Sequence, residues 1–188
     1  FTRIVLSYIS LSLFAVSAIA DPPSDSETIT HAPRIQHPKL DYILVKGGPF
    51  VRTMSSEQKT ITVPDFMLSR AEVTVAQYRA CVEAGVCTQP EAKLLCNWGK
   101  SNRDLHPINC IDWRQAKAVC AYMKKKLPTE SQWLFAAMGA QSSTFPWGDT
   151  WPPRSNIANL ADQSVVTERP YWRVLDSYAD GYVGTAPV

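Results

Sequence analysis

The stretch Leu127-Pro-Thr-Glu-Ser-Gln-Trp133 is typical of a helix start, and Pro146-Trp-Gly-Asp149 further on is typical of a tight aromatic turn. Within the first stretch, a threonine precedes a glutamine at the capping-box spacing, in which each residue's side chain accepts a hydrogen bond from the other's free backbone amide. The same spacing recurs twice earlier in the chain. The sequence therefore predicts three helices, which begin after Thr74, Asp112 and Thr129.

Short apolar runs before the first helix predict β-strands. Tyr42–Val45 is one run, and Phe50-Val51 resumes it after the turn residues Gly47-Gly48-Pro49, so the two are expected to form a hairpin-like pair. Alternation over Thr60–Val63 predicts a third strand, which Pro64 should end. Strands followed by helices favour the α+β fold class over an alternating parallel sheet.

Apolar spacing indicates which face each helix should bury. In helix order, the expected positions are Val75, Tyr78 and Val82; Ala116, Val119, Cys120 and Met123; and Trp133, Ala136 and Ala137. Gly85 and Gly139 predict the ends of the first and third helices. Lys124–Lys126 are expected in the last turn of the second, where they would complement the helix dipole, with an anion site as the less favoured alternative.

The composition is that of one globular domain with a core, at 188 residues and 45% hydrophobic residues. The formal net charge is +2, from 19 basic and 17 acidic residues. This balance, without a basic stripe that carries interleaved aromatic residues, gives no reason to expect a nucleic-acid partner.

The N-terminus is typical of a secretory signal. Arg3 precedes the mostly apolar stretch Ile4–Ile19, and Ala18-Ile-Ala20 has the small-x-small pattern of a cleavage site. A membrane anchor is the alternative, but the stretch is shorter than the roughly 20 residues that a span needs. We expect residues 1–20 to be a signal peptide and residues 21–40, rich in proline, a linker. After cleavage no membrane span is expected, and the protein should be periplasmic or secreted.

The first residue is phenylalanine rather than methionine, so the reading frame is expected to start upstream or to be incomplete. The chain has five cysteines, an odd number. In an oxidising compartment they should form disulfides, with one thiol left over or paired outside the chain. Zinc is disfavoured because no Cys-x-x-Cys is present and His106 has no second histidine at ligand spacing. No local signature marks any cysteine as catalytic.

Taken together, the motifs resemble those of the formylglycine-generating enzyme (sulfatase-modifying factor) family, over a partial domain at residues 41–188. The resembling segments, in chain order, are Ile43–Phe50, Phe66–Tyr78, His106–Cys120, Lys126–Trp133, Phe145–Asp149, Asn159, Asp180–Tyr182 and Thr185–Val188. Several such motifs in family order are far more specific than any one alone. The extra cysteines resemble the disulfide-bearing bacterial members.

The resemblance implies a loop-rich, C-type-lectin-like fold and, for a full-length active protein, oxidation of a sulfatase cysteine to Cα-formylglycine by oxygen. It also implies that the two reactive cysteines, and the copper(I) (Cu+) that they bind in aerobic members, belong to a segment after Val188. The chain is therefore expected to be truncated at its C-terminus, with no catalytic residue and no copper-binding residue of its own. A peptide or protein substrate such as a sulfatase is the implied partner.

The same resemblance implies which cysteine is left over. The family's counterpart of Cys120 pairs with a cysteine near the end of the domain, so Cys120 should be the odd thiol here. The other four are then expected to pair as Cys87–Cys96 and Cys81–Cys110. Four residues around the third helix depart from the family pattern, three of them by losing a charge, and these changes are expected to alter its ion pairs but not its buried face. They are Lys126, Gln132, Leu134 and Met138.

A structural calcium site is the one family site that this chain is expected to keep. The resemblance places its ligands at Asn159, Leu160, Asp180 and Tyr182. The side chains of Asn159 and Asp180 and the backbone carbonyls of the other two residues would coordinate Ca2+. Calcium prefers oxygen ligands, which irregular backbone can offer. Asp162, Asp176 and Glu168 are alternative ligands. In the competing interpretation, Asn159 and Asp180 only cap turns.

Two functions remain open from the sequence. The first is the formylglycine-generating oxidation, in which Trp98 and Trp113 would line a peptide cleft, although core packing is favoured for Trp113. The second is a noncatalytic exported binding module on the same scaffold, which the altered charges and extra cysteines favour modestly. The family's iron-dependent sulfoxide synthases are set aside, because a signal peptide and linker stand where those enzymes have a helical bundle with histidine ligands.

Overall fold

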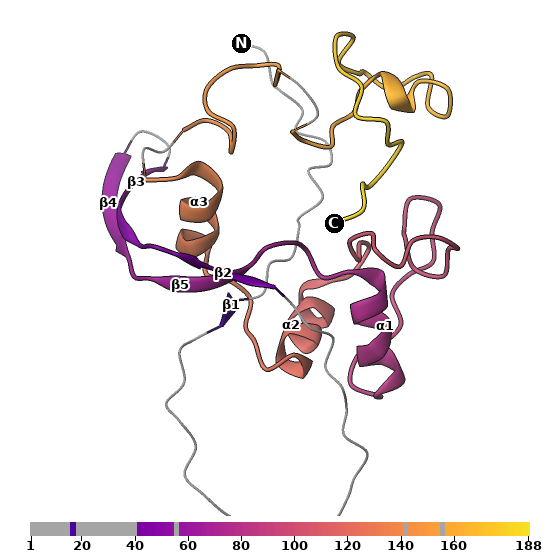
Figure 1. The fold of residues 1–188 in the computed structure, drawn as a ribbon, viewed down its shortest axis with the longest axis horizontal. Coiled ribbons are helices and arrows are strands. Elements are labelled where there is room, and N and C mark those ends of the chain that lie inside the picture. Colours follow the sequence, from indigo (N-terminus) through magenta and orange to yellow (C-terminus); the bar gives the residue numbers. More distant parts are fainter. Residues whose placement is uncertain (1–15, 18–40, 55–56, 141–142, 155–156) are drawn as a thin grey trace, which may run out of the picture.

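The computed structural model describes residues 16–17, 41–54, 57–140, 143–154 and 157–188 (Figure 1). The strands are β1 (Val16–Ser17), β2 (Tyr42–Val45), β3 (Gly48–Met54), β4 (Glu57–Val63) and β5 (Phe66–Ser69). The helices are α1 (Val75–Glu83), α2 (Trp113–Tyr122), α3 (Glu130–Met138) and the 3₁₀ turn η1 (Gln163–Val165). The predicted signal peptide and linker lie outside the described residues, apart from β1, so both stay predictions.

Four strands form one long antiparallel ribbon. β2 pairs with β5 as far as Val45↔Phe66, and β3 pairs with β4 from Gly48↔Val63 onward. The register is the same in both strand pairs. The residues between the pairs, 46 and 47 on one arm and 65 and 64 on the other, therefore lie opposite each other. β2 and β3 therefore follow each other along one arm of the ribbon, and the predicted hairpin between Tyr42–Val45 and Phe50-Val51 is wrong.

The other arm holds the predicted third strand. Thr60–Val63 lies in β4, and β4 ends before Pro64 as predicted. β5 was not predicted, because a run of three apolar residues and a serine is too short to show a helix or strand period. β5 is also the strand with which β1 pairs, through Val16↔Leu68 and Ser17↔Met67.

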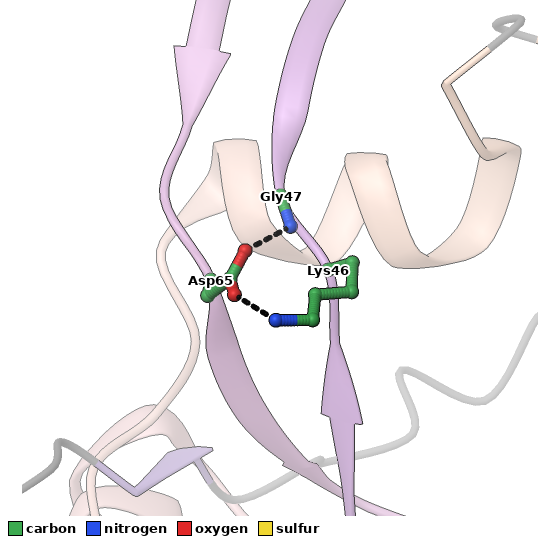
Figure 2. A network of polar contacts seen from close by, with 3 residues as sticks. All are labelled: Lys46, Gly47 and Asp65. Atoms are coloured by element: carbon green, nitrogen blue, oxygen red, sulfur yellow. Dashed lines mark hydrogen bonds and ion pairs between the residues drawn. The ribbon is translucent and has the colours of Figure 1, made fainter.

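The ribbon is joined at its centre by side-chain contacts in place of ladder bonds (Figure 2). Pro64 has no N–H to donate, and the next residue, Asp65, supplies acceptors instead. One carboxylate oxygen accepts from the Gly47 amide and the other from the Lys46 ammonium, both at 2.8 Å. These two bonds, Lys46 first, lower the pKa of Asp65. Their stabilisation is present above the ordinary pKa of an aspartate and is lost as the pH falls through the lowered value.

All three predicted capping boxes are confirmed, at Thr74, Asp112 and Thr129. Gly85 follows the cap of α1 with φ 71°, and Gly139 caps α3 with φ 68°, as predicted. α2, however, ends at Tyr122 and has no basic residue in its last turn. Lys124–Lys126 follow the helix, and the Lys125 ammonium lies 4.8 Å from the centre of the Tyr42 ring.

α1 and α2 lie side by side and form the first core, here called the helix cluster (Figure 1). Its centre is Tyr78, which is fully buried, stacks edge-on against Trp98 at 5.9 Å and donates its hydroxyl to the Thr88 carbonyl at 3.0 Å. Burial raises the pKa of Tyr78 to about 12. The buried members are Val73, Val75, Tyr78, Cys81, Cys87, Ile108, Val119, Tyr122 and Met123.

α3 packs on the ribbon and forms the second core, the ribbon cluster (Figure 1). Its buried members are Phe50, Val63, Phe66, Leu68 and Phe135. Phe135 meets Phe50 edge-on at 6.0 Å, so Phe135 is the buried residue of α3. The predicted face is wrong: Ala136 is exposed, and Trp133 and Ala137 are half-buried.

The altered residues on α3 also behave differently from expectation. Leu134 and Met138 pack against the ribbon cluster, so these changes do reach its buried face. An ion pair remains at the start of α3, where Arg52 from β3 binds the Glu130 carboxylate.

The disulfides are Cys81–Cys87 and Cys96–Cys110, so both predicted pairings are wrong. The cause is local. The chain reverses at the end of α1, where the amide of Cys87 donates to the carbonyl of Cys81 at 3.1 Å. The second pair is aligned by the residues next to its cysteines, because the Asn97 backbone amide donates to the Asn109 side-chain oxygen at 2.7 Å. Cys120 is the free cysteine of the described chain, as predicted.

The described residues form a mixed structure of short helices and strands, in agreement with the α+β prediction. None of the helices in those residues has the length and apolar character needed to cross a membrane.

Candidate functional site

Asp162 organises the loop that carries the predicted calcium ligands. Its side chain is completely buried. One carboxylate oxygen accepts from the Ser164 amide at 2.7 Å and caps η1, and the other accepts from the Asp180 amide at 2.6 Å. A buried carboxylate is stable only when such donors replace water. Asp162 therefore joins the two ends of the loop between residues 160 and 180.

Tyr178 closes the same loop from the other side. Its buried ring brings the hydroxyl to residue 158, where it donates to the Ala158 carbonyl at 2.7 Å and accepts from the Ala158 amide at 3.1 Å. The Tyr178 carbonyl accepts from the Gln163 amide at 3.2 Å. Irregular backbone is thus fixed by side-chain contacts rather than by regular secondary structure.

Three of the four predicted calcium ligands lie together. Asp180 is the centre, because one carboxylate oxygen accepts from the Leu160 amide at 2.9 Å and the other from the Tyr182 amide at 2.8 Å. The bond to Tyr182 is an Asx-type turn, so Asp180 does cap a turn, and this leaves the calcium prediction untested. Asn159 precedes Leu160 in the chain and is exposed.

The kind of donor fits calcium. A carboxylate oxygen has more than one lone pair, so Asp180 can accept an amide and still offer electrons to a cation. Among the described residues, no backbone hydrogen bond reaches the carbonyls of Leu160 or Tyr182. The set supplies few charges, however. Within the ranges that the structure describes, no group of three or more His, Cys, Asp or Glu side chains is placed to hold a metal ion.

The alternative ligands differ in where they lie. Asp162 contacts the Asp180 backbone, but its side chain is completely buried and each of its oxygens accepts from an amide. Asp176 accepts from the side chain of Gln163 at 3.1 Å on the surface. Glu168 is exposed.

The described chain offers no site that fits copper(I). Four cysteines are tied in disulfides, and Cys120 is only 1% exposed. Burial raises the pKa of the Cys120 thiol to about 11, so it stays protonated and unreactive at neutral pH. Burial and then Cys120 raise the pKa of the neighbouring Tyr42 to about 12. The buried Tyr42 hydroxyl has no hydrogen-bond partner among the described residues.

The two tryptophans proposed to line a peptide cleft differ in burial, and the core packing favoured for Trp113 is wrong. Trp98 is half-buried against Tyr78 in the helix cluster. Trp113, for which core packing was favoured, is 65% exposed, with the Lys117 ammonium 5.1 Å from its ring centre. Trp113 starts α2, and the apolar face of that helix begins later, at Ala116.

One buried polar cluster was missed by the sequence analysis. Asn97 and His106 are 4% and 7% exposed, and both contact Thr185. The asparagines beside Cys96 and Cys110 were a signal that polar contacts hold this loop. The contact with Thr185, however, lies too far away in the sequence to be predicted.

Residues 26–188 match the sequence profile of the sulfatase-modifying factor enzyme 1-like domain. This match covers most of the chain, and the chain belongs to that family.

Individual relatives match over about half of the chain. The formylglycine-generating enzyme of Mus musculus is 34% identical over 89 residues, which cover 46% of this chain and 22% of the relative. That of Thermomonospora curvata is 35% identical over 89 residues, 47% of this chain and 27% of the relative. The inactive C-alpha-formylglycine-generating enzyme 2 of Bos taurus is 35% identical over 83 residues, 44% and 25% respectively. The matched part thus spans about a quarter of each relative.

Proposed function

We propose that the protein is an exported sulfatase-modifying factor which, in full-length form, oxidises a sulfatase cysteine to Cα-formylglycine. Membership of the family over residues 26–188 carries this proposal. The two disulfides support export to the periplasm or beyond, because disulfides persist in oxidising compartments. The scaffold proposed for it is C-type-lectin-like.

Within that protein, the described residues serve as scaffold rather than as the reactive part. The oxidation needs accessible thiols, and Cys120 is buried and protonated. The reactive cysteines and the copper(I) of the proposed enzyme therefore belong to segments other than these. The ribbon, the disulfide-closed loops and the Asp162 loop would hold the surrounding surface in place.

The activity is tested with the full-length protein, loaded with copper(I), and a peptide that contains Cys-x-Pro-x-Arg. We expect mass spectrometry to detect conversion of the cysteine to an aldehyde that reacts with hydroxylamine. A peptide with serine in place of cysteine is the control and should stay unchanged. A folded, full-length protein that leaves the cysteine peptide intact would contradict the oxidase proposal.

The alternative is a noncatalytic exported binding module on the same scaffold. It is favoured by one comparison, since a relative named as inactive is as similar to this chain as the relatives named as enzymes. The same experiment distinguishes the two. Capture of the cysteine peptide without conversion supports the binding module, and conversion excludes it.

We also propose that Asn159, Leu160, Asp180 and Tyr182 bind a structural calcium ion. Calcium should raise the free energy of unfolding by about 2.7 kcal/mol at one hundred times its dissociation constant, because it binds only the folded loop. Thermal unfolding in calcium and in chelator measures this. Equal melting temperatures in both would count against the site.

Asn159→Ala is the sharpest variant for this site. Asn159 is exposed, so its loss should leave stability in chelator within about 0.5 kcal/mol of the parent protein. Calcium affinity, measured by calorimetry, should fall about tenfold, which corresponds to about 1.4 kcal/mol of binding free energy, because one oxygen ligand is lost. Unchanged affinity would remove Asn159 from the ligand set.

A further inference from the structure

The two disulfides differ in how well solvent reaches them. Cys81 and Cys87 are 0% and 6% exposed, so both ends of their bond lie inside the helix cluster. Cys96 is 1% exposed, but its partner Cys110 lies at the surface. A thiolate has to reach a sulfur atom to exchange with a disulfide, so exposed disulfides are the ones that reductants open. Access therefore distinguishes Cys96–Cys110 from the other pair.

The backbone at Cys110 also favours opening. Its φ is 58°, in the left-handed region, which is unfavourable for a residue that carries a side chain. The disulfide to Cys96 helps to hold Cys110 in this conformation. When the disulfide opens, the backbone of Cys110 can relax, so the reduced form gains stability relative to a disulfide without such strain.

Other contacts hold most of the loop that this disulfide closes. The Ile108 amide donates to the Val73 carbonyl at 2.8 Å, and the His106 carbonyl accepts from the Val75 amide at 2.9 Å, at the start of α1. These bonds do not depend on the disulfide, so residues 106–108 stay attached to the helix cluster when it opens. The fold is therefore expected to survive opening, and the two sulfurs stay close enough to form the bond again.

Thr185 bridges the two arms of the same loop. Its hydroxyl oxygen accepts from Asn97 Nδ2 at 2.8 Å and lies 2.9 Å from His106 Nδ1. Asn97 follows Cys96 on one arm, and His106 lies on the arm that leads to Cys110. Thr185 keeps both contacts only while the two arms stay together, and the disulfide ties them covalently. The C-terminal segment, which reaches the loops beside α1 in Figure 1, is thus anchored where the disulfide closes the loop.

We propose that Cys96–Cys110 is a thiol-exchange site: a dithiol opens it in the folded protein, and opening loosens the hold on Thr185. One thiolate of the dithiol attacks the exposed Cys110 sulfur and forms a mixed disulfide there. The bond to Cys96 breaks, and the Cys96 sulfur leaves with the electron pair and takes up a proton. The second thiolate of the dithiol then attacks the dithiol sulfur in the mixed disulfide and releases Cys110. Two electrons and two protons have passed to the cysteine pair, and the dithiol has become a disulfide.

The test treats the complete, folded protein with dithiothreitol, quenches with acid, and labels the new thiols in denaturant for peptide mass spectrometry. We expect Cys96 and Cys110 to become labelled together while Cys81–Cys87 stays closed and the circular dichroism spectrum is unchanged. The NMR signal of the Thr185 methyl group should shift in proportion to the opened fraction. A parallel arm uses a reduced Cys-x-x-Cys protein; opening by either dithiol supports the site and identifies the source, and opening by neither overturns it. Equal rates for the two disulfides, or an unmoved Thr185 signal after full opening, overturn it as well.

Two matched variants test which sulfur is attacked. Cys96→Ser leaves the exposed Cys110 as a thiol, and Cys110→Ser leaves the buried Cys96. Labelling of the folded variants with N-ethylmaleimide, read by peptide mass spectrometry, should modify Cys110 in the first and leave Cys96 as protected in the second as the buried Cys120 is in both. The Thr185 methyl signal of Cys96→Ser should match that of the reduced parent protein. If Cys96 reacts as fast as Cys110, the proposed direction of attack is wrong.

Discussion

Gly47→Ala is expected to destabilise the protein by about 3 kcal/mol or more, the upper range for forcing atoms into a packed position. A methyl group on Gly47 would lie 2.0 Å from the Val63 carbonyl oxygen and 2.4 Å from the Pro64 carbonyl carbon. Both obstacles are backbone, so no rotamer change can relieve the clash. The strands would have to separate where Asp65 binds the Gly47 amide, and β2 would lose its register with β5.

The neighbouring glycine is a matched control for this prediction. A methyl group on Gly48 would meet nothing within 4 Å. Gly48→Ala should therefore change the free energy of unfolding by no more than about 0.5 kcal/mol. Urea denaturation, followed by circular dichroism, measures both variants. Similar midpoints for the two would mean that the ribbon is not closed at Gly47 in the way described.

The sequence predicted the helices well because their signals are local. A threonine or aspartate and a glutamine three positions later form the whole capping box, so no distant residue has to be known. The ends at Gly85 and Gly139 are local in the same sense. The end of α2 was misplaced because the left-handed residue after it is Lys124, with φ 56°, and not the glycine that usually marks a helix end in the sequence.

Pairing was harder, since it depends on contacts between distant residues. Two apolar runs around a glycine turn look like a hairpin, yet β2 and β3 continue along one arm and pair with β5 and β4. The disulfides failed for a related reason. The resemblance indicated only that Cys120 is the odd thiol, and no local signal paired the other four, whereas a tight turn after α1 brings Cys87 back to Cys81.

The candidate site was predicted in part. Asp180 does collect Leu160 and Tyr182 around its carboxylate, which a motif could indicate. The deeper role of Asp162 could not be read from the sequence, because nothing in a run of polar loop residues marks which carboxylate will be buried. Burial is a property of the closed loop, and Tyr178 contributes to that closure from a later position.

Asp162→Asn is expected to cost about 2–3 kcal/mol, the range for losing a hydrogen bond to a buried charged group. Asparagine keeps the shape but replaces one acceptor oxygen by an NH₂ group. That group would face either the Ser164 or the Asp180 amide, which now donate at 2.7 Å and 2.6 Å. One buried N–H would lose its acceptor, and the ends of the loop would separate.

Asp176→Asn provides the comparison for Asp162. Asp176 lies on the same loop but is exposed, and its carboxylate accepts from the side chain of Gln163 at 3.1 Å. Its substitution should change stability by less than about 0.5 kcal/mol. Both variants are measured by urea denaturation in chelator, so the outcome does not depend on calcium. Hydrogen exchange at the Asp180 amide should accelerate in Asp162→Asn alone. Equal effects of the two substitutions would show that the buried carboxylate does not hold the loop.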